Sequence, residues 1–394
     1  MTLRQKIEQE IRERGPIPFS RYMELCLYDP DLGYYSRNAE QFGKAGDFYT
    51  SSDVHAVFGR LLTRQFDEMW RALGSPAQIE ILELGPGRGL FAQDVLDWSE
   101  KKFPDFFRAL HYRLVETSFV LRKRLQATLE RHFSAGKASL CSASSTLGEG
   151  TTSVVPKKAA QARALAPEVP VIVFANEFFD ALPVEVLSPQ GELRISEKDG
   201  RLVEAWNVAS PEALEFLDRY SVHPEDGERI EASLIARCYM SLIAATVKRG
   251  FMIAIDYGYT RQEQLAGRHR GTIATYRQHS ESANPYEAPG EQDITAHVNF
   301  TALTAAAEQG GMQVQPLLTQ SQFLLGIGEH NQFADAFEEC RLPQERAKVA
   351  LQLKHLITPT GMGESFHVLI ASKDIDTERV SRLSGLMFGK TARP

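Results

Sequence analysis

From Ile79 onward the sequence alternates between short apolar runs and stretches with helical spacing, and this alternation limits the fold more than any other feature. The apolar runs are "IEILELG", "HYRLVET", "VPVIVFANE" and "GFMIAIDYG", and the first two are followed by "LFAQDVLDWSEKKF" and "SFVLRKRLQATLERHF". A further strand is expected at residues 138–141, and a final one at "ESFHVLIASK". Strands that alternate with helices in this way predict an α/β fold with a mostly parallel sheet and helices on both faces.

The segments outside this alternation predict additions to the sheet. Residues 3–14 and 57–73 carry apolar residues at helical spacing, with a glycine-rich loop between them. Residues 184–207 alternate in hydropathy and contain Gln190-Gly191 and Asp199-Gly200, which predict the turns of a β-hairpin insertion.

The remaining segments are predicted to be helical or irregular. A helix is expected over residues 228–248, and another is expected to open with Asp293 or Thr295 as its cap. Residues 321–358 predict a helical insertion, whereas residues 142–166, rich in Ser, Thr, Gly and Ala, predict a loop or flexible insertion.

These patterns divide the chain into a core and four other parts. The expected parts are an N-terminal helical and glycine-loop cap (1–75), a core in two pieces (76–183 and 224–320), the hairpin insertion (184–223), the helical insertion (321–358), and a final core strand with a C-terminal tail (359–394).

Composition excludes several classes of function. The 394-residue chain has a net charge of −7, which disfavours nucleic acid as the main partner because phosphate binding needs clustered Lys and Arg. The four cysteines are scattered without ligand spacing, so we predict no metal site, no disulfide framework and a reducing compartment. Because no apolar run reaches about 18 residues and the N-terminus lacks a signal-peptide core, we expect a cytoplasmic protein with no membrane span.

A glycine turn follows the first strand of the alternation. The motif "ELGPGRG" places Glu83 ahead of glycines spaced G-x-G-x-G. Glycines let the backbone approach a ligand closely, and the helix that follows presents free N–H groups there. Leu90 stands where the dinucleotide fingerprint G-x-G-x-x-G needs glycine, so that motif is excluded. Glu116 ends the second strand, where an acidic residue accepts hydrogen bonds from ribose hydroxyls in nucleotide-binding folds, although both acids could simply be surface charges at strand ends.

A polar group follows the fourth strand, at the end of an otherwise apolar run. "NEFFDALP" begins with Asn176 and Glu177 and continues through two phenylalanines to Asp180. Because open α/β sheets bind ligands at the carboxyl ends of their strands, these side chains are expected to face a ligand. The fifth strand ends in Asp256, for which lining the same site and a purely structural role remain open. The structural alternative for Asp180 is a cap of the following turn.

Several longer motifs together resemble one enzyme family. They are "KAGDFYTSSDVHAVFG", "ELGPGRGLFAQDVL", "VETSFVLRKRLQ", "NEFFDALPVEVL", "IDYGY", "PYEAPGEQDITAHVNFTAL" and "MGESFHVL", which fall in order from about residue 20 to residue 373. With this set the chain resembles the MidA-like methyltransferases. That family includes the mitochondrial arginine methyltransferase needed for the assembly of respiratory complex I.

The resemblance implies a class I methyltransferase fold of Rossmann-like type, S-adenosyl-L-methionine as cofactor, and an arginine of a protein as acceptor. In the mitochondrial branch it also implies symmetric dimethylation, with a respiratory-complex-type subunit as the protein. By motif, the cofactor residues carried over are Gly46, Asp47, Thr50, Ser51, Glu83, Gly85, Pro86, Gly87, Glu116 and Asn176. The hydroxyl-rich loop around Thr50 suits a lid over the cofactor, or a helix N-cap.

The chemistry of arginine methylation suggests a role for the acids. A guanidinium stays cationic at neutral pH and has to approach a second cation, so carboxylates are expected to hold it and offset its charge. Glu177 and Asp180 are the predicted clamp, with Asp256 beside them, whereas His279 and His297 are weaker candidates for a catalytic base.

Two other functions remain open from the sequence. A methyltransferase of a small molecule or of another side chain would carry the same cofactor motifs, and a non-enzymatic assembly factor would use the same cleft to bind a partner. The hairpin insertion and the segment 321–358 could serve as interfaces of a homodimer.

Overall fold

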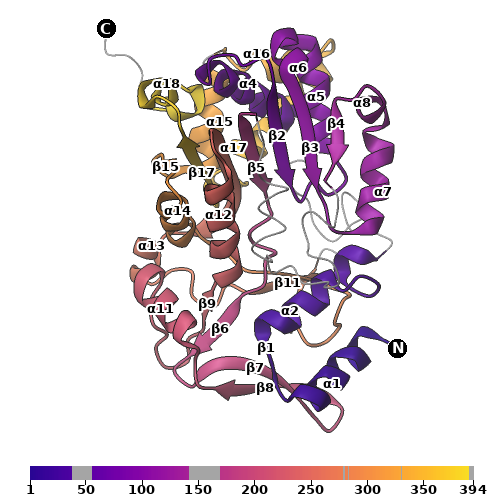
Figure 1. The fold of residues 1–394 in the computed structure, drawn as a ribbon, viewed down its shortest axis with the longest axis vertical. Coiled ribbons are helices and arrows are strands. Elements are labelled where there is room, and N and C mark those ends of the chain that lie inside the picture. The colour runs from indigo at the N-terminus through magenta and orange to yellow at the C-terminus, as the bar shows by residue number, and fades with distance from the viewer. Residues whose placement is uncertain (38–55, 142–168, 278–279, 283, 330, 390–394) are drawn as a thin grey trace.

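A twisted, mostly parallel sheet forms the centre of the molecule, and its strands descend toward a smaller sheet and the N-terminal helices (Figure 1). The computed structural model describes residues 1–37, 56–141, 169–277, 280–282, 284–329 and 331–389. The strand order is β15-β17-β10-β5-β2-β3-β4, with β14 beside β10 and β16 beside β17. The bounds are β2 (Ile79–Leu84), β3 (Leu110–Val115), β4 (Ala138–Leu140), β5 (Val171–Asn176), β10 (Gly250–Tyr259), β14 (Val298–Asn299), β15 (Gln313–Val314), β16 (Leu318–Thr319) and β17 (Phe366–Lys373).

Parallel pairing runs through the middle of this sheet. β4, β3, β2, β5 and β10 are all parallel neighbours, and β17 joins β10 in the antiparallel sense. The predicted α/β fold with a mostly parallel sheet is therefore confirmed.

Helices cover both faces of the sheet. One face carries α4 (Ala56–Ala72), α5 (Leu90–Lys102), α6 (Pro104–Ala109), α15 (Gln320–Glu329), α16 (Ala334–Phe337) and α17 (Pro343–Ile357). The other face carries α12 (Leu234–Thr246) and α14 (Phe300–Gln309). The helices α7 (Phe119–Thr128) and α8 (Glu130–Ser134) connect β3 to β4, while α18 (Thr377–Ser381) and the 3-10 turn η2 (Ser384–Leu386) close the described chain.

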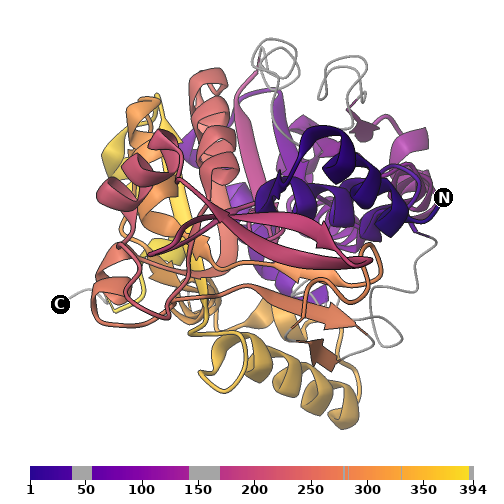
Figure 2. The same ribbon diagram turned by 90° about the horizontal axis from the view of Figure 1, so that it is seen from below.

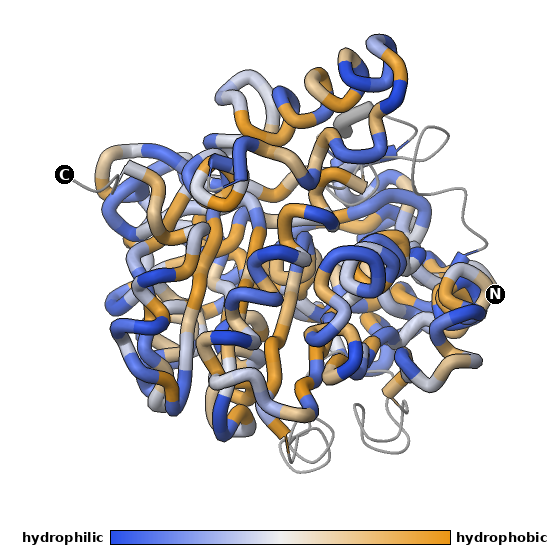
Figure 3. The backbone as a smooth tube through the Cα atoms, turned by 90° about the horizontal axis from the view of Figure 1, so that it is seen from above, coloured by the Kyte–Doolittle hydropathy of each residue, from blue (hydrophilic) through white to orange (hydrophobic). Residues whose placement is uncertain are grey.

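The strands are apolar because both of their faces are covered. In β5, Ile172 and Phe174 point into the core under α4 and α5, whereas Val171, Val173 and Ala175 point into the core under α12 and α14. Such continuous apolar runs are typical of parallel strands buried on both sides. Figure 3 shows the same distribution, with the hydrophobic residues concentrated along the strands and on the inward sides of the helices.

A second sheet packs against the N-terminal helices and lies beyond the carboxyl edge of the main sheet. It contains β1 (Ile17–Pro18), β6 (Glu185–Ser188), β7 (Gly191–Lys198), β8 (Arg201–Asn207) and β9 (Ile230–Ala232). Its apolar side packs on α1 (Leu3–Arg14) and α2 (Phe19–Tyr28), which lie along β7 in both ribbon views (Figures 1 and 2). The 3-10 turn η1 (Tyr34–Ser36) follows α2, and α11 (Pro211–Tyr220) packs against β9, α12 and α14. The short helix α13 (Arg261–Leu265) follows β10, and a third sheet contains β11 (Ala274–Arg277), β12 (Ser280–Ser282) and β13 (Asp293–Thr295).

Two predicted helices begin later than expected. The helix predicted from residue 228 starts at Leu234, because Ile230–Ala232 pairs with β6 as an edge strand. The helix predicted to open at Asp293 or Thr295 starts at Phe300 instead. Asp293–Thr295 pairs with β11, and the Asn299 side chain caps the helix by accepting the Ala302 N–H at 3.0 Å.

Residues 185–207 form three antiparallel strands, β6, β7 and β8, joined by two turns, and helices lie between residues 320 and 357. The division of the chain into the five expected parts stays a prediction. Among the described residues, no helix combines the length and apolar character that crossing a membrane requires. The predicted loop at residues 142–166 lies outside the described residues.

Candidate functional site

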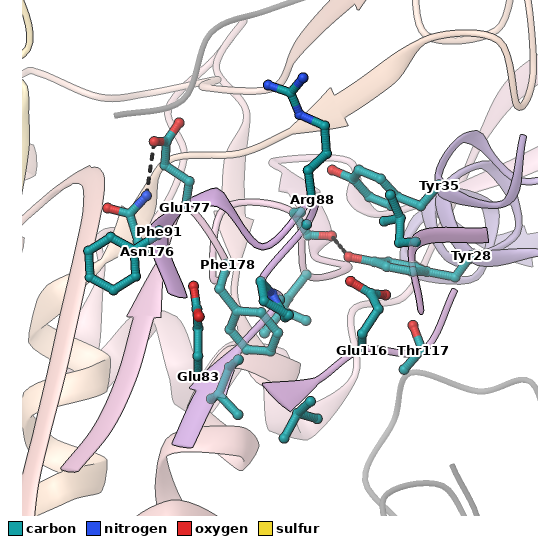
Figure 4. Close-up of a pocket in the computed structure, with 18 of the residues that line it drawn as sticks. Tyr28, Tyr35, Glu83, Arg88, Phe91, Glu116, Thr117, Asn176, Glu177 and Phe178 are labelled. Atoms are coloured by element: carbon teal, nitrogen blue, oxygen red, sulfur yellow. Dashed lines mark hydrogen bonds between the residues drawn. The ribbon is translucent and has the colours of Figure 1, made fainter. Parts of the chain in front are cut away.

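A pocket opens between the carboxyl ends of β2, β3 and β5 and the segment that carries Tyr28 and Tyr35 (Figure 4). The space between its lining atoms is about 1190 Å³, open solvent included. Because the three strands are parallel neighbours, their carboxyl ends bring residues from distant parts of the sequence to one edge. The polar residues that line it are Tyr28, Tyr35, Glu83, Arg88, Glu116, Thr117, Asn176, Glu177 and Tyr239.

The glycine turn forms the floor of this pocket. Gly85, Gly87 and Gly89 have φ values of +63°, +53° and +80°, a region that residues with a side chain rarely adopt. A Cβ on Gly85 would lie 3.0 Å from the ring of Phe178, so a larger residue there would be both strained and crowded. The turn therefore offers bare backbone to a ligand at the start of α5.

Glu83 is buried at the end of β2, with its carboxylate accepting a hydrogen bond from the Tyr112 hydroxyl at 2.9 Å. Burial raises the pKa of Glu83 to about 8, and the Tyr112 hydrogen bond opposes this shift. A carboxylate in such a position gains strongly from a cationic ligand, because the cation compensates for lost hydration.

Glu116 occupies the corresponding place at the end of β3. Its carboxylate accepts the Ser118 N–H at 2.8 Å, and burial raises its pKa to about 7 against the effects of backbone N–H groups and Arg122. These contacts fix the carboxylate at the side of the pocket that Tyr28 and Thr117 share (Figure 4).

Asn176 and Glu177 line the opposite side of the pocket (Figure 4). The Asn176 amide donates to the Glu177 carboxylate at 3.1 Å, while the amide oxygen of Asn176 is buried with no hydrogen-bond partner among the described residues. Glu177 has φ +49°, which is uncommon for a residue with a side chain. A buried acceptor without a partner is a place where a ligand donor would be stabilising.

Asp180 is placed differently from the sequence expectation. It was predicted to form a clamp with Glu177, but it does not line the pocket and is only 6% exposed. Its carboxylate accepts the Tyr257 hydroxyl at 2.6 Å, and burial raises its pKa to about 6. The backbone turns after Glu177, and the Asp180 side chain bonds Tyr257 on β10 instead of lining this pocket.

Asp256 is not among the residues that line this pocket, so a catalytic role for it stays a prediction. It is 1% exposed and accepts the backbone N–H groups of Phe178, Phe179 and Asp180. Burial raises its pKa, and the Asp180 and Glu177 carboxylates raise it further. The two phenylalanines of this segment differ in environment. Phe179 is buried in the core, whereas Phe178 lines the pocket next to Gly85.

Sequence reasoning missed two tyrosines from the N-terminal region. The Tyr28 hydroxyl donates to the Ala181 carbonyl at 2.9 Å, and the Tyr35 hydroxyl donates to the Asp293 carboxylate at 3.0 Å. The Ser118 hydroxyl donates to the Tyr35 carbonyl at 2.7 Å, which ties this region to the end of β3. No local pattern reveals these contacts, because each joins segments far apart in the sequence.

Arg88 was also missed, although it lies within the quoted glycine motif. It is the basic residue among the described residues that line the pocket, and its guanidinium stands near Tyr35 at the rim (Figure 4). Its position between Gly87 and Gly89 in the ligand-binding turn could have indicated that Arg88 lines the pocket.

The remaining candidates are not part of the pocket as described. Gly46, Asp47, Thr50, Ser51 and His279 lie outside the described residues. His297 contacts the rings of Tyr257 and His269, and burial lowers its pKa to about 4. It would therefore be neutral at pH 7, where it also makes a poor match for proton transfer.

Comparison with known proteins assigns the chain and its fold to one class of enzyme. A family model described as "Putative S-adenosyl-L-methionine-dependent methyltransferase" matches residues 61–318, more than half of the chain. The chain belongs to this family. It is a methyltransferase of the class I fold, with S-adenosyl-L-methionine as its cofactor.

Individual relatives span nearly the whole chain. "Protein arginine methyltransferase NDUFAF7 homolog, mitochondrial" from Drosophila melanogaster is 29% identical over 389 residues, covering 93% of this chain and 84% of its own. "Protein arginine methyltransferase NDUFAF7, mitochondrial" from Homo sapiens is 29% identical over 379 residues, covering 91% and 80%. A crystal structure from Burkholderia thailandensis, bound to S-adenosyl-homocysteine, is 28% identical with a TM-score of 0.77, covering 96% and 94%. The resemblance to the MidA-like family is confirmed.

The prediction of a cytoplasmic protein is wrong on this comparison. The relatives from Drosophila melanogaster, Danio rerio and Homo sapiens all carry "mitochondrial" in their names. The prediction rested partly on the cysteine pattern, which indicates reducing conditions but does not distinguish one reducing compartment from another.

Replacing Gly85 with valine should abolish binding of S-adenosyl-L-methionine, because the side chain would enter the pocket floor at a positive φ and crowd Phe178. Isothermal titration calorimetry measures the binding. Gly136→Val is the matched control, since Gly136 also has a positive φ (+68°) but meets no atom within 4 Å and lies outside the pocket. Unchanged binding by the Gly85 variant would remove the glycine turn from the cofactor site.

Replacing Glu83 with glutamine should weaken cofactor binding and raise the stability of the fold at neutral and higher pH. Because the folded-state pKa of Glu83 is raised to about 8, its stabilising effect is complete below the unfolded value near 4.5 and is lost as pH rises through 8. The glutamine variant should therefore gain in Tm over the wild type as pH rises from 5 to 8, while its affinity for S-adenosyl-L-methionine falls.

Thermal unfolding across this pH range and calorimetry at pH 8 check both parts. Glu80→Gln serves as the control, since Glu80 lies on the same strand, pairs with Arg113 and does not line the pocket. A Tm difference that does not change with pH would contradict the burial of an ionisable Glu83.

Proposed function

We propose that this methyltransferase modifies an arginine side chain of a protein. The observation that carries the proposal is the surplus of carboxyl groups in the pocket: Glu83, Glu116 and Glu177 outnumber Arg88, the one basic residue among the described lining residues. The protein arginine methyltransferases from Drosophila melanogaster and Homo sapiens, which match over nine-tenths of the chain, support the same acceptor.

Two of the three carboxylates suit the cofactor. Bound S-adenosyl-L-methionine supplies an electrophilic methyl group on a sulfonium cation. Glu116 would accept hydrogen bonds from the ribose hydroxyls, as acids at the end of the second strand do in nucleotide-binding folds. Glu83 would face the cationic methionyl end, and the unpartnered amide oxygen of Asn176 would accept from its ammonium group.

The glycine turn and the N-terminal loop complete this proposal for the cofactor. Gly85, Pro86 and Gly87 would let the ligand lie against the backbone, at the N-terminus of α5. Gly46, Asp47, Thr50 and Ser51 remain proposed cofactor contacts on the strength of the family motif alone.

Glu177 is then left for the acceptor. Its carboxylate stands on the Asn176 side of the pocket, and the Asn176 amide orients it. A carboxylate there would bind a guanidinium through charge-assisted hydrogen bonds, offset its charge and turn one nitrogen toward the methyl group. No strong base is required beforehand, because the guanidinium loses its proton readily once alkylation begins.

The burial of Asp180 changes the predicted clamp. With Asp180 bonded to Tyr257 behind the pocket, the acceptor would meet one carboxylate directly instead of two. A respiratory-complex-type subunit, as the family resemblance suggests, is the proposed acceptor protein, and symmetric dimethylation is the proposed product.

Replacing Glu177 with glutamine should leave S-adenosyl-L-methionine binding within about twofold and lower methyl transfer on the order of 100-fold, because the neutral amide no longer offsets the guanidinium charge. Transfer is measured with radiolabelled S-adenosyl-L-methionine and protein extract from cells that lack the gene, followed by acid hydrolysis and separation of methyl-arginine.

The exposed Glu212 on α11 provides the control, and Glu212→Gln should transfer at the wild-type rate. Full activity in the Glu177 variant would exclude Glu177 from the reaction. Label that appears only in small molecules or in other amino acids would contradict arginine as the acceptor.

A further inference from the structure

Glu177 adopts a backbone conformation that its own residue type disfavours. Its φ of +49° lies in the left-handed region, where a side chain crowds the following carbonyl. Such a conformation persists only where the surrounding structure holds it, and residues of this kind gather at ligand sites. The contacts that hold Glu177 therefore decide where its carboxylate points.

Asp256 on the neighbouring strand binds the turn that directly follows Glu177. One oxygen of its carboxylate accepts the N–H groups of Phe178, Phe179 and Asp180 at 3.2, 3.0 and 3.3 Å, and the other accepts the Tyr257 N–H at 3.0 Å. Successive N–H groups that converge in this way form a concavity that binds an anion. Here a carboxylate of the chain itself fills it.

The sheet register brings the two acids together. β5 and β10 are parallel with Ile255 opposite Asn176, so Glu177 follows the end of β5 beside Asp256, which lies within β10. The Glu177 N–H donates to the Ile255 carbonyl at 3.0 Å, which continues the ladder to the last residue before the turn. Glu177 and the three residues that follow it are thus all hydrogen-bonded to β10.

Asp256 does not reach a ligand itself. It is 1% exposed and is separated from the pocket by the turn that it holds. A second tie runs in parallel, from the Tyr257 hydroxyl to the Asp180 carboxylate at 2.6 Å. Asp256, which the sequence predicted in the site, therefore supports Glu177, which lines the pocket.

We infer that Asp256 is a positioning residue for the acceptor: it holds the turn after β5, keeps Glu177 in its left-handed conformation, and so aims the Glu177 carboxylate into the pocket. The inference rests on the proposed function of Glu177. It goes beyond that function by assigning the orientation of the acceptor carboxylate to a neighbouring strand.

Asp256→Asn tests the inference, because asparagine keeps the shape but weakens the bonds to the converging N–H groups. Expected results are an affinity for S-adenosyl-L-methionine within about twofold of wild type and a methyl-transfer rate on the order of 10- to 100-fold lower, as for a misplaced group. A crystal structure of the variant with S-adenosyl-homocysteine should show the Glu177 carboxylate displaced from the pocket. Asp256→Glu, which keeps the charge but pushes the turn outward, should behave in the same way and replaces the first variant if that fails to fold.

Tyr259→Phe is the matched control, since Tyr259 is buried on the same strand and its hydroxyl bonds neither Asp256 nor the turn after β5. It should transfer methyl groups within about threefold of wild type, because positioning through Asp256 is retained. Asp256 variants that transfer at the wild-type rate would overturn the inference, as would a lower rate with Glu177 unmoved in the crystal. If Glu177→Gln is itself fully active, the proposed function fails instead, and the displacement of Glu177 in the crystal still decides the structural part.

Discussion

Parallel pairing of β2 with β3 on one side and β5 on the other is the constraint on which the site depends. This pairing ends three strands at one edge and brings Glu83, Glu116 and Glu177 around a single pocket, although they are separated by many residues in the sequence. The aliphatic and aromatic residues on both faces of these strands stabilise the pairing. A slip of one residue in β5 would exchange its two faces and turn its polar end away from the pocket.

Electrostatics then distinguish the three carboxylates. Glu83 and Glu116 are buried, with pKa values raised to about 8 and about 7, so a cationic ligand would relieve the cost of ionising them. Glu177 stands on the opposite side with the Asn176 amide as its partner. A pocket with more carboxyl groups than basic groups suits a cationic cofactor, which would favour their ionised forms, and, in our proposal, a cationic acceptor.

The sequence predicted the parts of the site that follow from strand ends. Periodicity located the strands, and strands that run in parallel place their carboxyl ends together, so Glu83, Glu116, Asn176 and Glu177 were expected at one edge. The orientation of Asp180 was not predictable, because it depends on the left-handed turn at Glu177. Asp256 was expected at the end of its strand, whereas β10 continues to Tyr259 and Asp256 lies inside it. Tyr28 and Tyr35 escaped prediction because they reach the pocket through tertiary contacts alone.

The central claim is that this methyltransferase acts on a protein arginine, and mass spectrometry of respiratory-complex and ribosomal proteins with and without the gene tests it most directly. The account predicts that methylation of a specific arginine is lost without the gene, returns with the wild-type chain, and does not return with Glu177→Gln. An unchanged set of methyl-arginines, with methylation lost from a small molecule or another side chain, would contradict it.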